Sequence, residues 1–226
     1  MGSPDPSLYS GRLRLAGASL VAAAVLFWVS WLLMPGVGIT DAERILELVA
    51  TRRSDVLVSS VLQTVSAVLY VPAILGVVVR PPYSAHRSVA IGAGVFLVGA
   101  MGSAADAVYH LLAYAMTAPG TDPAQMVPVM QFMQGPGLRL ILPLVAAYFI
   151  GAYLFTRAVA RARGDSAAVA WLYPAAVLVA IAGAVLASRS ALTGRAVGLT
   201  VLFIVSAAQV WLGLVIARHE PSTSSI

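Results

Sequence analysis

The sequence predicts an all-α protein, a polytopic membrane bundle of six transmembrane helices with two short amphipathic helices on the outer side. Hydrophobic residues make up 60% of the 226 residues and charged residues only 10%, whereas soluble domains carry about 25% charged residues. The mean hydropathy is +0.89. Six apolar stretches come near or exceed the roughly 20 residues that a helix needs to cross a bilayer. We therefore expect residues 1–226 to form a single integral membrane domain.

The predicted spans end at residues that typically stop a helix or lie at a membrane interface. The first span ends at Pro35-Gly36, after Trp31 of an interfacial aromatic belt, and the second ends at Arg80-Pro81. The second and third spans are longer than needed, so we expect them to tilt or to project beyond the lipid. The six predicted spans are Leu13–Met34, Asp55–Val79, Ser88–Thr117, Gly137–Arg157, Val169–Ala187 and Arg195–Ala217.

Two of the predicted outer loops are long enough to hold short helices. Thr40 and Glu43 form the capping-box pattern T-x-x-E ahead of an amphipathic segment. In the second loop, Met126, Met130 and Met133 recur at helical spacing and give a soft apolar face. Helices of this kind commonly rest on lipid at the membrane surface. The alternative is that they form a lid over a cavity at the outer mouth of the bundle.

The distribution of arginine predicts the orientation in the membrane. All 14 basic residues are Arg. With the N-terminus inside, eight of them lie on the inner side and six on the outer side, and Arg157, Arg161 and Arg163 cluster inside. We expect a multi-pass protein of the cell membrane with both termini in the cytoplasm. Its net charge of +5 fits this loop bias, so the lipid bilayer is an expected partner and nucleic acid is not.

The third predicted span carries the polar pair that most clearly suggests a functional site. Asp106 and His110 are four residues apart, so they share one face of the helix. A carboxylate at bilayer depth is costly and normally faces the bundle interior. The low dielectric there favours the uncharged acid, which can serve as a general acid. On the second span, Gln63 lies on a polar face with Ser59 and Ser66, and we predict a hydrogen bond from Gln63 to Asp106 or His110. A buried pair that only ties two helices together would show the same spacing.

Aromatic and charged residues near this pair are the candidates for binding a substrate. They lie on the same spans or at the outer rim, and the aromatic ones are otherwise packing or interface residues. The candidates are Tyr109, Tyr114, Tyr70, Trp31, Arg139 and Glu47. Cys is absent, and only one of the three His residues, His110, lies within a predicted span. Because metal-ligand clusters and nucleotide-binding motifs are also missing from the sequence, no metal or cofactor is expected.

The size, the six spans and the outer stretch DAERILELVATRRSD (residues 41–55) resemble actinobacterial six-helix integral membrane families of unknown function. More loosely, a small bundle with one intramembrane acid among aromatic residues resembles the compact membrane-bound terpene cyclases, which protonate an olefin or epoxide of an isoprenoid. This resemblance implies that Asp106 is the proton donor. It also implies a second acid, for which Glu47, Glu43 and Asp55 at the outer rim are candidates.

Three functions are compatible with these observations. The first is acid–base chemistry on a lipophilic substrate, with isoprenoid cyclisation as the best guess, Asp106 as the proton donor and His110 and Gln63 orienting it. The second is a small proton-linked transporter with Asp106 and His110 as a relay. The apolar segment Val89–Val98 argues against the continuous polar path that this requires. The third is a non-catalytic accessory membrane subunit, whose small residues would serve close helix packing.

Overall fold

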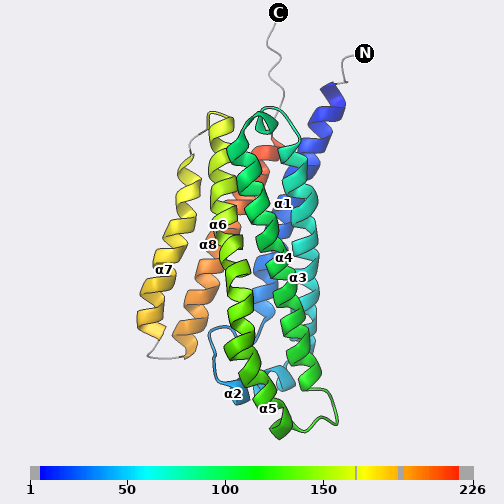
Figure 1. Ribbon diagram of the computed structural model, residues 1–226, viewed down its shortest axis with the longest axis vertical. Coiled ribbons are helices and arrows are strands. Elements are labelled where there is room, and N and C mark those ends of the chain that lie inside the picture. Colours follow the sequence, from blue (N-terminus) through cyan, green and yellow to red (C-terminus); the bar gives the residue numbers. More distant parts are fainter. Residues whose placement is uncertain (1–5, 166, 188–190, 219–226) are drawn as a thin grey trace, which may run out of the picture.

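The computed structural model describes residues 6–165, 167–187 and 191–218, and the regular structure in these ranges is helical (Figure 1). Short helical turns connect some of the longer helices, at Tyr83–Ala85, Met133–Gly137 and Ala167–Trp171. The α-helices are α1 (Pro6–Leu33), α2 (Ala42–Thr51), α3 (Arg53–Val78), α4 (Arg87–Met116), α5 (Pro123–Phe132), α6 (Leu138–Ala162), α7 (Leu172–Ala187) and α8 (Ala191–Ala217).

Five helical stretches within the described ranges are long and apolar enough to cross a membrane, so the prediction of six spans is wrong in number. These stretches are Gly11–Leu33, Arg53–Val78, Arg87–Met116, Pro123–Ala162 and Gly194–Ala217. The expected fifth span, Val169–Ala187, is instead divided between a 3-10 turn and α7, which has 16 residues. A helix of that length reaches about 24 Å, less than the roughly 30 Å of hydrocarbon in a bilayer.

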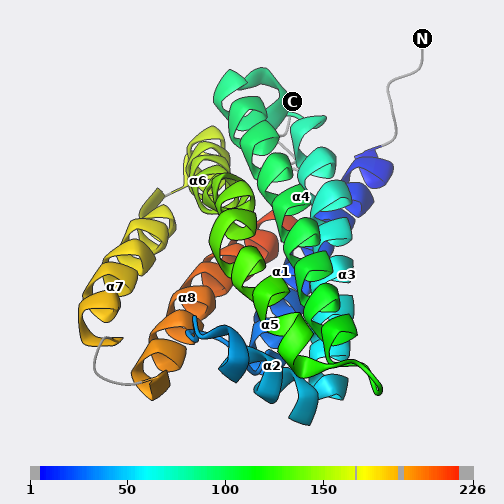
Figure 2. The same cartoon turned by 60° about the horizontal axis from the view of Figure 1, so that its bottom comes forward.

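Helices α1, α3, α4, α6 and α8 form the bundle, and α7 lies at its edge. Helix α1 packs between α3 and α8, while α4 packs between α3 and α6. Helix α7 lies beside α8 in both Figure 1 and Figure 2 and returns the chain along it. As a result, α1 begins and α8 ends at the same end of the bundle, and α2 and α5 lie at the opposite end.

Glycines let α4 and α6 approach each other closely. A Cβ added at Gly99 would lie 2.2 Å from the backbone of Tyr148, and one at Gly92 would lie 2.6 Å from the backbone of Phe155. Gly102 is similarly crowded by Leu144. These three positions confirm the expected role of small residues in close packing. Gly94, which belongs to the same predicted set, has no neighbour within 4 Å of such a Cβ.

Serines of α3 tie this helix to α1. Ser59 Oγ donates to the carbonyl of Ser30 at 2.7 Å, and Ser66 Oγ donates to the carbonyl of Ala23 at 2.7 Å. All of these side-chain donors are buried. The polar face predicted on this span therefore faces the bundle interior, and its two serines serve helix association.

Helices α2 and α5 cover one end of the bundle. Ile45 and Val49 of α2 are buried with Met130 and Met133 of the second loop in one apolar cluster, so the two short helices pack against each other and against the bundle. The residue that caps α2 is Asp41, whose carboxylate accepts a hydrogen bond from a backbone N–H at 2.8 Å, and not the expected Thr40. Both residues fit an N-cap, and Asp is the more favourable of the two.

The second short helix is not separate from the span that follows it. We expected the segment Gly135-Pro136-Gly137 to break the chain into two helices, but Met133–Gly137 forms a π-helical turn that joins α5 to α6. Because a π turn shifts the hydrogen-bond pattern by one residue, it accommodates the missing N–H of Pro136 without ending the helix.

Arg195 of α8 holds the end of α1. Its guanidinium donates to the carbonyl oxygens of Met34 and Pro35 at 3.2 Å and of Leu32 at 3.0 Å. The last carbonyls of a helix lack partners within the helix, and a cation is favourable at this end of the helix dipole. The contact fixes α8 against the turn that follows Trp31.

Replacing Arg195 by alanine is expected to lower the free energy of unfolding by about 1.5–3 kcal/mol, the usual contribution of a charged hydrogen bond. Thermal unfolding in detergent micelles measures the loss. The control is Arg44→Ala, which breaks an exposed ion pair with Glu47 and should cost about 1 kcal/mol or less. Equal losses in the two variants would contradict a special role for Arg195.

Candidate functional site

Gln63 of α3 bridges Asp106 and His110 of α4. Gln63 Nε2 donates to Asp106 Oδ2 at 2.7 Å, and Gln63 Oε1 lies 3.2 Å from His110 Nδ1. His110 Nε2 is 4.0 Å from the same Asp106 oxygen, within ion-pair range but too far for a hydrogen bond. The predicted hydrogen bond from Gln63 is confirmed, and Gln63 contacts both residues rather than one of them.

The hydrogen bonds of Gln63 favour one tautomer of His110. The amide N–H of Gln63 points to Asp106, so its carbonyl oxygen faces His110. Since this carbonyl can only accept, a hydrogen bond between them requires the His110 tautomer with its proton on Nδ1. Within the described residues, both contacts of the Asp106 carboxyl involve Oδ2. Oδ1 takes part in neither of these contacts.

A cavity of about 350 Å³ adjoins this cluster on the side of α2 and α5. Asp106, His110, Tyr109 and Trp31 form its polar and aromatic wall. The remainder is largely apolar and includes residues from the loop after α1, from α2, from α5 and from the start of α6: Val37, Ile39, Ile45, Val49, Met130 and Leu138. Side chains of Asp106 and His110 are 13% and 12% exposed, so the cavity is the space that they can share with a ligand.

A second, smaller cavity of about 50 Å³ lies on the other side of Asp106. Asp106 and Trp31 line both cavities, and Gln63 and Ser103 line the smaller one. Trp31 also contacts the His110 ring edge to face, with 5.4 Å between the ring centroids. Asp106 and Trp31 thus stand at the junction between the two spaces.

Beyond the smaller cavity, three helices meet in a buried polar layer that we call the tyrosine layer. It consists of Tyr70 of α3, Tyr148 of α6 and Gln209 of α8. The two hydroxyls are 2.7 Å apart, and Tyr70 also donates to the Gln209 carbonyl oxygen. At 1.5 Å per residue, Tyr70 is about 10 Å along α3 from Gln63. Phe96 packs against both tyrosine rings, so this layer fills the bundle interior.

The structure brings together only part of the predicted substrate-binding set. Tyr109 and Trp31 line the larger cavity with Asp106. Tyr70 is fully buried in the tyrosine layer and lines neither cavity beside Asp106. Tyr114 lies one turn further along α4 than His110, under the guanidinium of Arg53 at 4.1 Å from the ring centroid, and also lines neither cavity.

Arg139 and Glu47 lie apart from Asp106. Arg139 is exposed near the start of α6, and neither cavity beside Asp106 includes it. Glu47 forms an exposed ion pair with Arg44 at 2.9 Å. Other residues of its helix, α2, face the cavity. A helical wheel shows which residues of α2 share a face, but it does not show which neighbouring helix or cavity that face contacts. Neither Glu47 nor Glu43 or Asp55 lines the cavities beside Asp106, so the second acid implied by the resemblance has no counterpart there.

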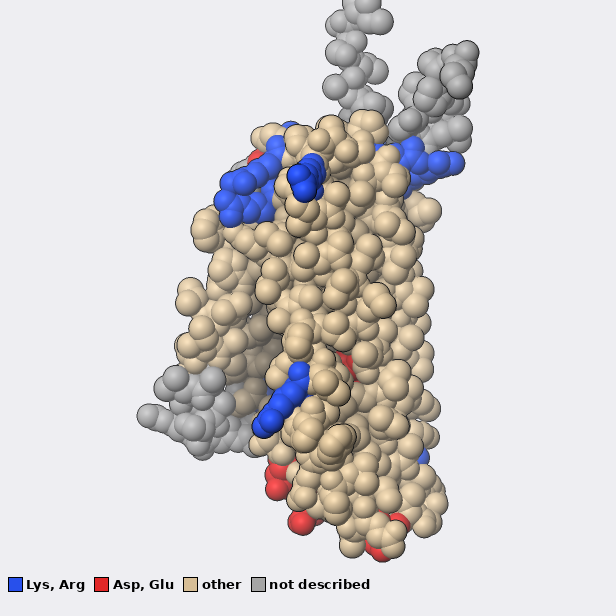
Figure 3. Space-filling model, in the orientation of Figure 1, with Lys and Arg blue, Asp and Glu red and all other residues tan. Residues whose placement is uncertain are grey.

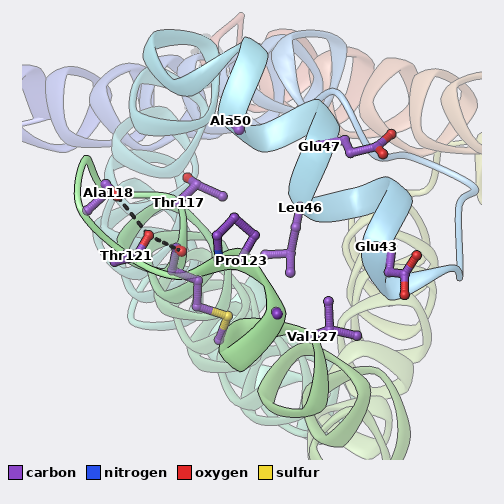
Figure 4. A pocket seen from close by; sticks show the side chains of 11 residues that line it. Glu43, Leu46, Glu47, Ala50, Thr117, Ala118, Thr121, Pro123 and Val127 are labelled. Atoms are coloured by element: carbon purple, nitrogen blue, oxygen red, sulfur yellow. Dashed lines mark hydrogen bonds between the residues drawn. The ribbon is translucent and has the colours of Figure 1, made fainter.

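Glu43 and Glu47 instead border a separate pocket of about 460 Å³ between α2, α5 and the end of α4. Figure 4 shows Leu46, Pro123 and Val127 converging on this pocket, while both carboxylates point away from it. This pocket is lined mainly by apolar and hydroxyl side chains, and it lies on the opposite side of α2 from Ile45 and Val49, which line the cavity beside Asp106.

The sequence did not reveal the partnership of Tyr148 and Gln209. Gln209 was recognisable as an amide in an apolar span, the same signal that singled out Gln63. Its partners come from residues 61 and 139 positions earlier in the chain, and helix periodicity does not show which helices are neighbours. A tyrosine in an apolar span such as Tyr148 is most often a packing residue, whereas its hydroxyl here joins the tyrosine layer.

No protein-family model matches this chain, and no curated protein or solved structure matches it. What the structure establishes is an α-helical protein with helices suited to a membrane and a partly buried carboxyl group beside a cavity. Any more specific function has to be argued from the geometry of this site.

Proposed function

We propose that the protein is an integral membrane enzyme that uses Asp106 as a general acid on a lipophilic substrate. The observation that carries this proposal is a carboxyl group held by Gln63 at the wall of a largely apolar cavity of about 350 Å³. Sites for small molecules typically measure about 300–1,000 Å³ and combine apolar walls with a few polar groups. Ile45 and Val49 of α2 and Met130 of α5 contribute apolar side chains to the wall of this space.

The three polar residues have separate roles in this mechanism. Asp106 gives the proton on Oδ1 to the substrate, and the Gln63 N–H stabilises the carboxylate that remains. His110 is fixed by its own bond to Gln63, and its unprotonated Nε2 takes up the proton that the product cation loses. A small movement of the ring then brings Nε2 from 4.0 Å into hydrogen-bond range of Asp106, to which it returns this proton. For an isoprenoid, protonation gives a cation that cyclises and then loses a proton, so the reaction consumes no oxidant or reductant.

A proton-linked transporter receives less support from the same geometry. Such a protein needs a polar path that reaches both faces of the membrane. Within the described residues, the tyrosine layer and the rings of Phe27, Phe96 and Phe155 fill the interior beyond Asp106. The polar residues beside the cavity therefore favour chemistry over passage.

We further propose that the termini lie in the cytoplasm and that α2 and α5 face the outside. On the face shown in Figure 3, basic side chains gather at the end where α1 begins and α8 ends, and acidic side chains gather at the α2 and α5 end. Basic residues are enriched in cytoplasmic loops of membrane proteins. The site then opens toward the outer half of the membrane.

Deuterium transfer from solvent tests the proposal. The protein is reconstituted in lipid vesicles in D₂O and incubated with linear isoprenoid alcohols, ketones, epoxides and hydrocarbons, and products are identified by mass spectrometry. We expect at least one substrate to give an isomer that carries one non-exchangeable deuterium, bound to carbon at the site of protonation. Conversion of none of these substrates, or equal conversion in vesicles without the protein, would contradict the proposal. Asp106→Asn supplies the decisive comparison.

A further inference from the structure

Three side chains around Asp106 have buried polar atoms without a hydrogen-bond partner within the described residues. They are Trp31 Nε1, Ser103 Oγ and Tyr109 OH. Ser103 is three residues before Asp106 on α4 and Tyr109 is three residues after it, so each lies about one turn away. Ser103 is only 6% exposed. All three line one or both of the cavities beside Asp106.

Three unpaired polar groups so close together are unfavourable unless a ligand forms hydrogen bonds with them. A buried donor without an acceptor costs free energy, and native proteins leave few of them. The indole N–H of Trp31 can only donate, while the two hydroxyls can donate or accept. A hydrocarbon in this site would leave all three unpaired, whereas an oxygen atom can accept from several donors at once.

We infer that the substrate of this site carries an oxygen acceptor such as a carbonyl, and that this oxygen binds at the cavity junction, where Trp31 donates to it beside Asp106. The inference rests on the proposed function and adds the class of substrate: an oxygenated lipophile rather than a pure hydrocarbon. The smaller cavity receives the oxygen near Ser103 and Trp31, and the larger cavity receives the apolar body of the molecule. Tyr109 borders the larger cavity and adds a second hydroxyl.

A matched pair of probes tests this inference by binding alone. The probes are geranylacetone and the same molecule with its C=O replaced by C=CH₂, titrated by calorimetry into the full chain in lipid nanodiscs. We expect the ketone to bind about tenfold more tightly, and Trp31→Phe to remove most of this preference. In protein labelled with ¹⁵N-Trp, the Trp31 indole signal should shift with the ketone and not with the alkene.

Trp28→Phe is the control for the tryptophan substitution. Trp28 lies on the same helix and also has an unpaired indole nitrogen, but it packs against Phe203 and lines neither cavity. This variant should keep the full preference for the ketone. Equal affinity of the two probes, no binding of either, or an unchanged preference in Trp31→Phe would overturn the inference.

Asp106→Asn separates this inference from the proposed function. The variant keeps the cavity and the three donors, so its preference for the ketone should remain within about threefold of the parent protein. If Asp106→Asn retains turnover while the ketone preference depends on Trp31, the acid role fails and the binding site stands. If Asp106→Asn loses turnover but Trp31→Phe leaves the relative affinity for the two probes unchanged, the acid role stands and the oxygen site fails.

Discussion

Asp106→Asn is expected to lower the rate of product formation by about 10²–10⁴-fold, the usual contribution of a general acid. Asparagine has the size of aspartic acid but cannot release a proton at neutral pH. Its carbonyl oxygen can still accept the hydrogen bond that Gln63 donates to Asp106 at 2.7 Å. The variant should therefore fold and bind substrate, and the loss should appear in turnover measured by deuterium transfer in reconstituted vesicles.

The control for this variant is Asp122→Asn at the start of α5. Asp122 caps the helix by accepting from a backbone N–H at 3.0 Å, and Asn is an equally good cap, so stability and turnover should both be retained. Full turnover in Asp106→Asn would remove the proposed mechanism. A parallel fall in folded protein and turnover would instead show that the Asp106 cluster is structural.

Gly99→Ala is expected to destabilise the protein by about 3 kcal/mol or more, the upper end of the range for overpacking. The added Cβ would lie 2.2 Å from both the backbone nitrogen and the Cα of Tyr148. Backbone atoms cannot rotate away, so α4 and α6 have to separate. Because Tyr148 belongs to the tyrosine layer, the separation also disrupts its bonds to Tyr70 and Gln209.

Gly94→Ala makes the same substitution on the same helix at a position without neighbours within 4 Å of the added atom. It should be neutral or stabilise the helix by up to about 1 kcal/mol through the higher helix propensity of alanine. Unfolding by denaturant in detergent, followed by circular dichroism, measures both variants. Similar stability of Gly99→Ala and Gly94→Ala would show that the close contact between α4 and α6 is wrong.

Helix periodicity predicted the faces of the helices well, and this explains the correct placement of Gln63. Its spacing from Ser59 and Ser66 put all three on one buried side of α3, and that side does face α1 and α4. Asp106 and His110 followed from the same argument. In an apolar span, a large polar side chain has few places to lie other than the interior, so the sequence was informative here.

The same periodicity could not identify which helices are neighbours or where each helix begins and ends. Tyr70 shares the face of Gln63, yet its partners on α6 and α8 place it in the tyrosine layer instead of the cavity. Hydropathy alone does not distinguish a full span from a shorter apolar helix such as α7. The predicted span began at Val169, but α7 begins only at Leu172. The role of Arg195 was also missed, because a guanidinium that binds carbonyls of another helix leaves no pattern in the sequence.

The tyrosine layer has a consequence for the supply of protons. It fills the interior between Asp106 and the end of the bundle where α1 begins, whereas the cavity beside Asp106 lies toward the end with α2 and α5. For the proposed enzyme, this geometry favours a supply of protons from the α2 and α5 side alone. In sealed vesicles carrying a pH gradient, the turnover of the proposed enzyme would then follow the pH of the compartment that α2 and α5 face and not the pH of the other compartment.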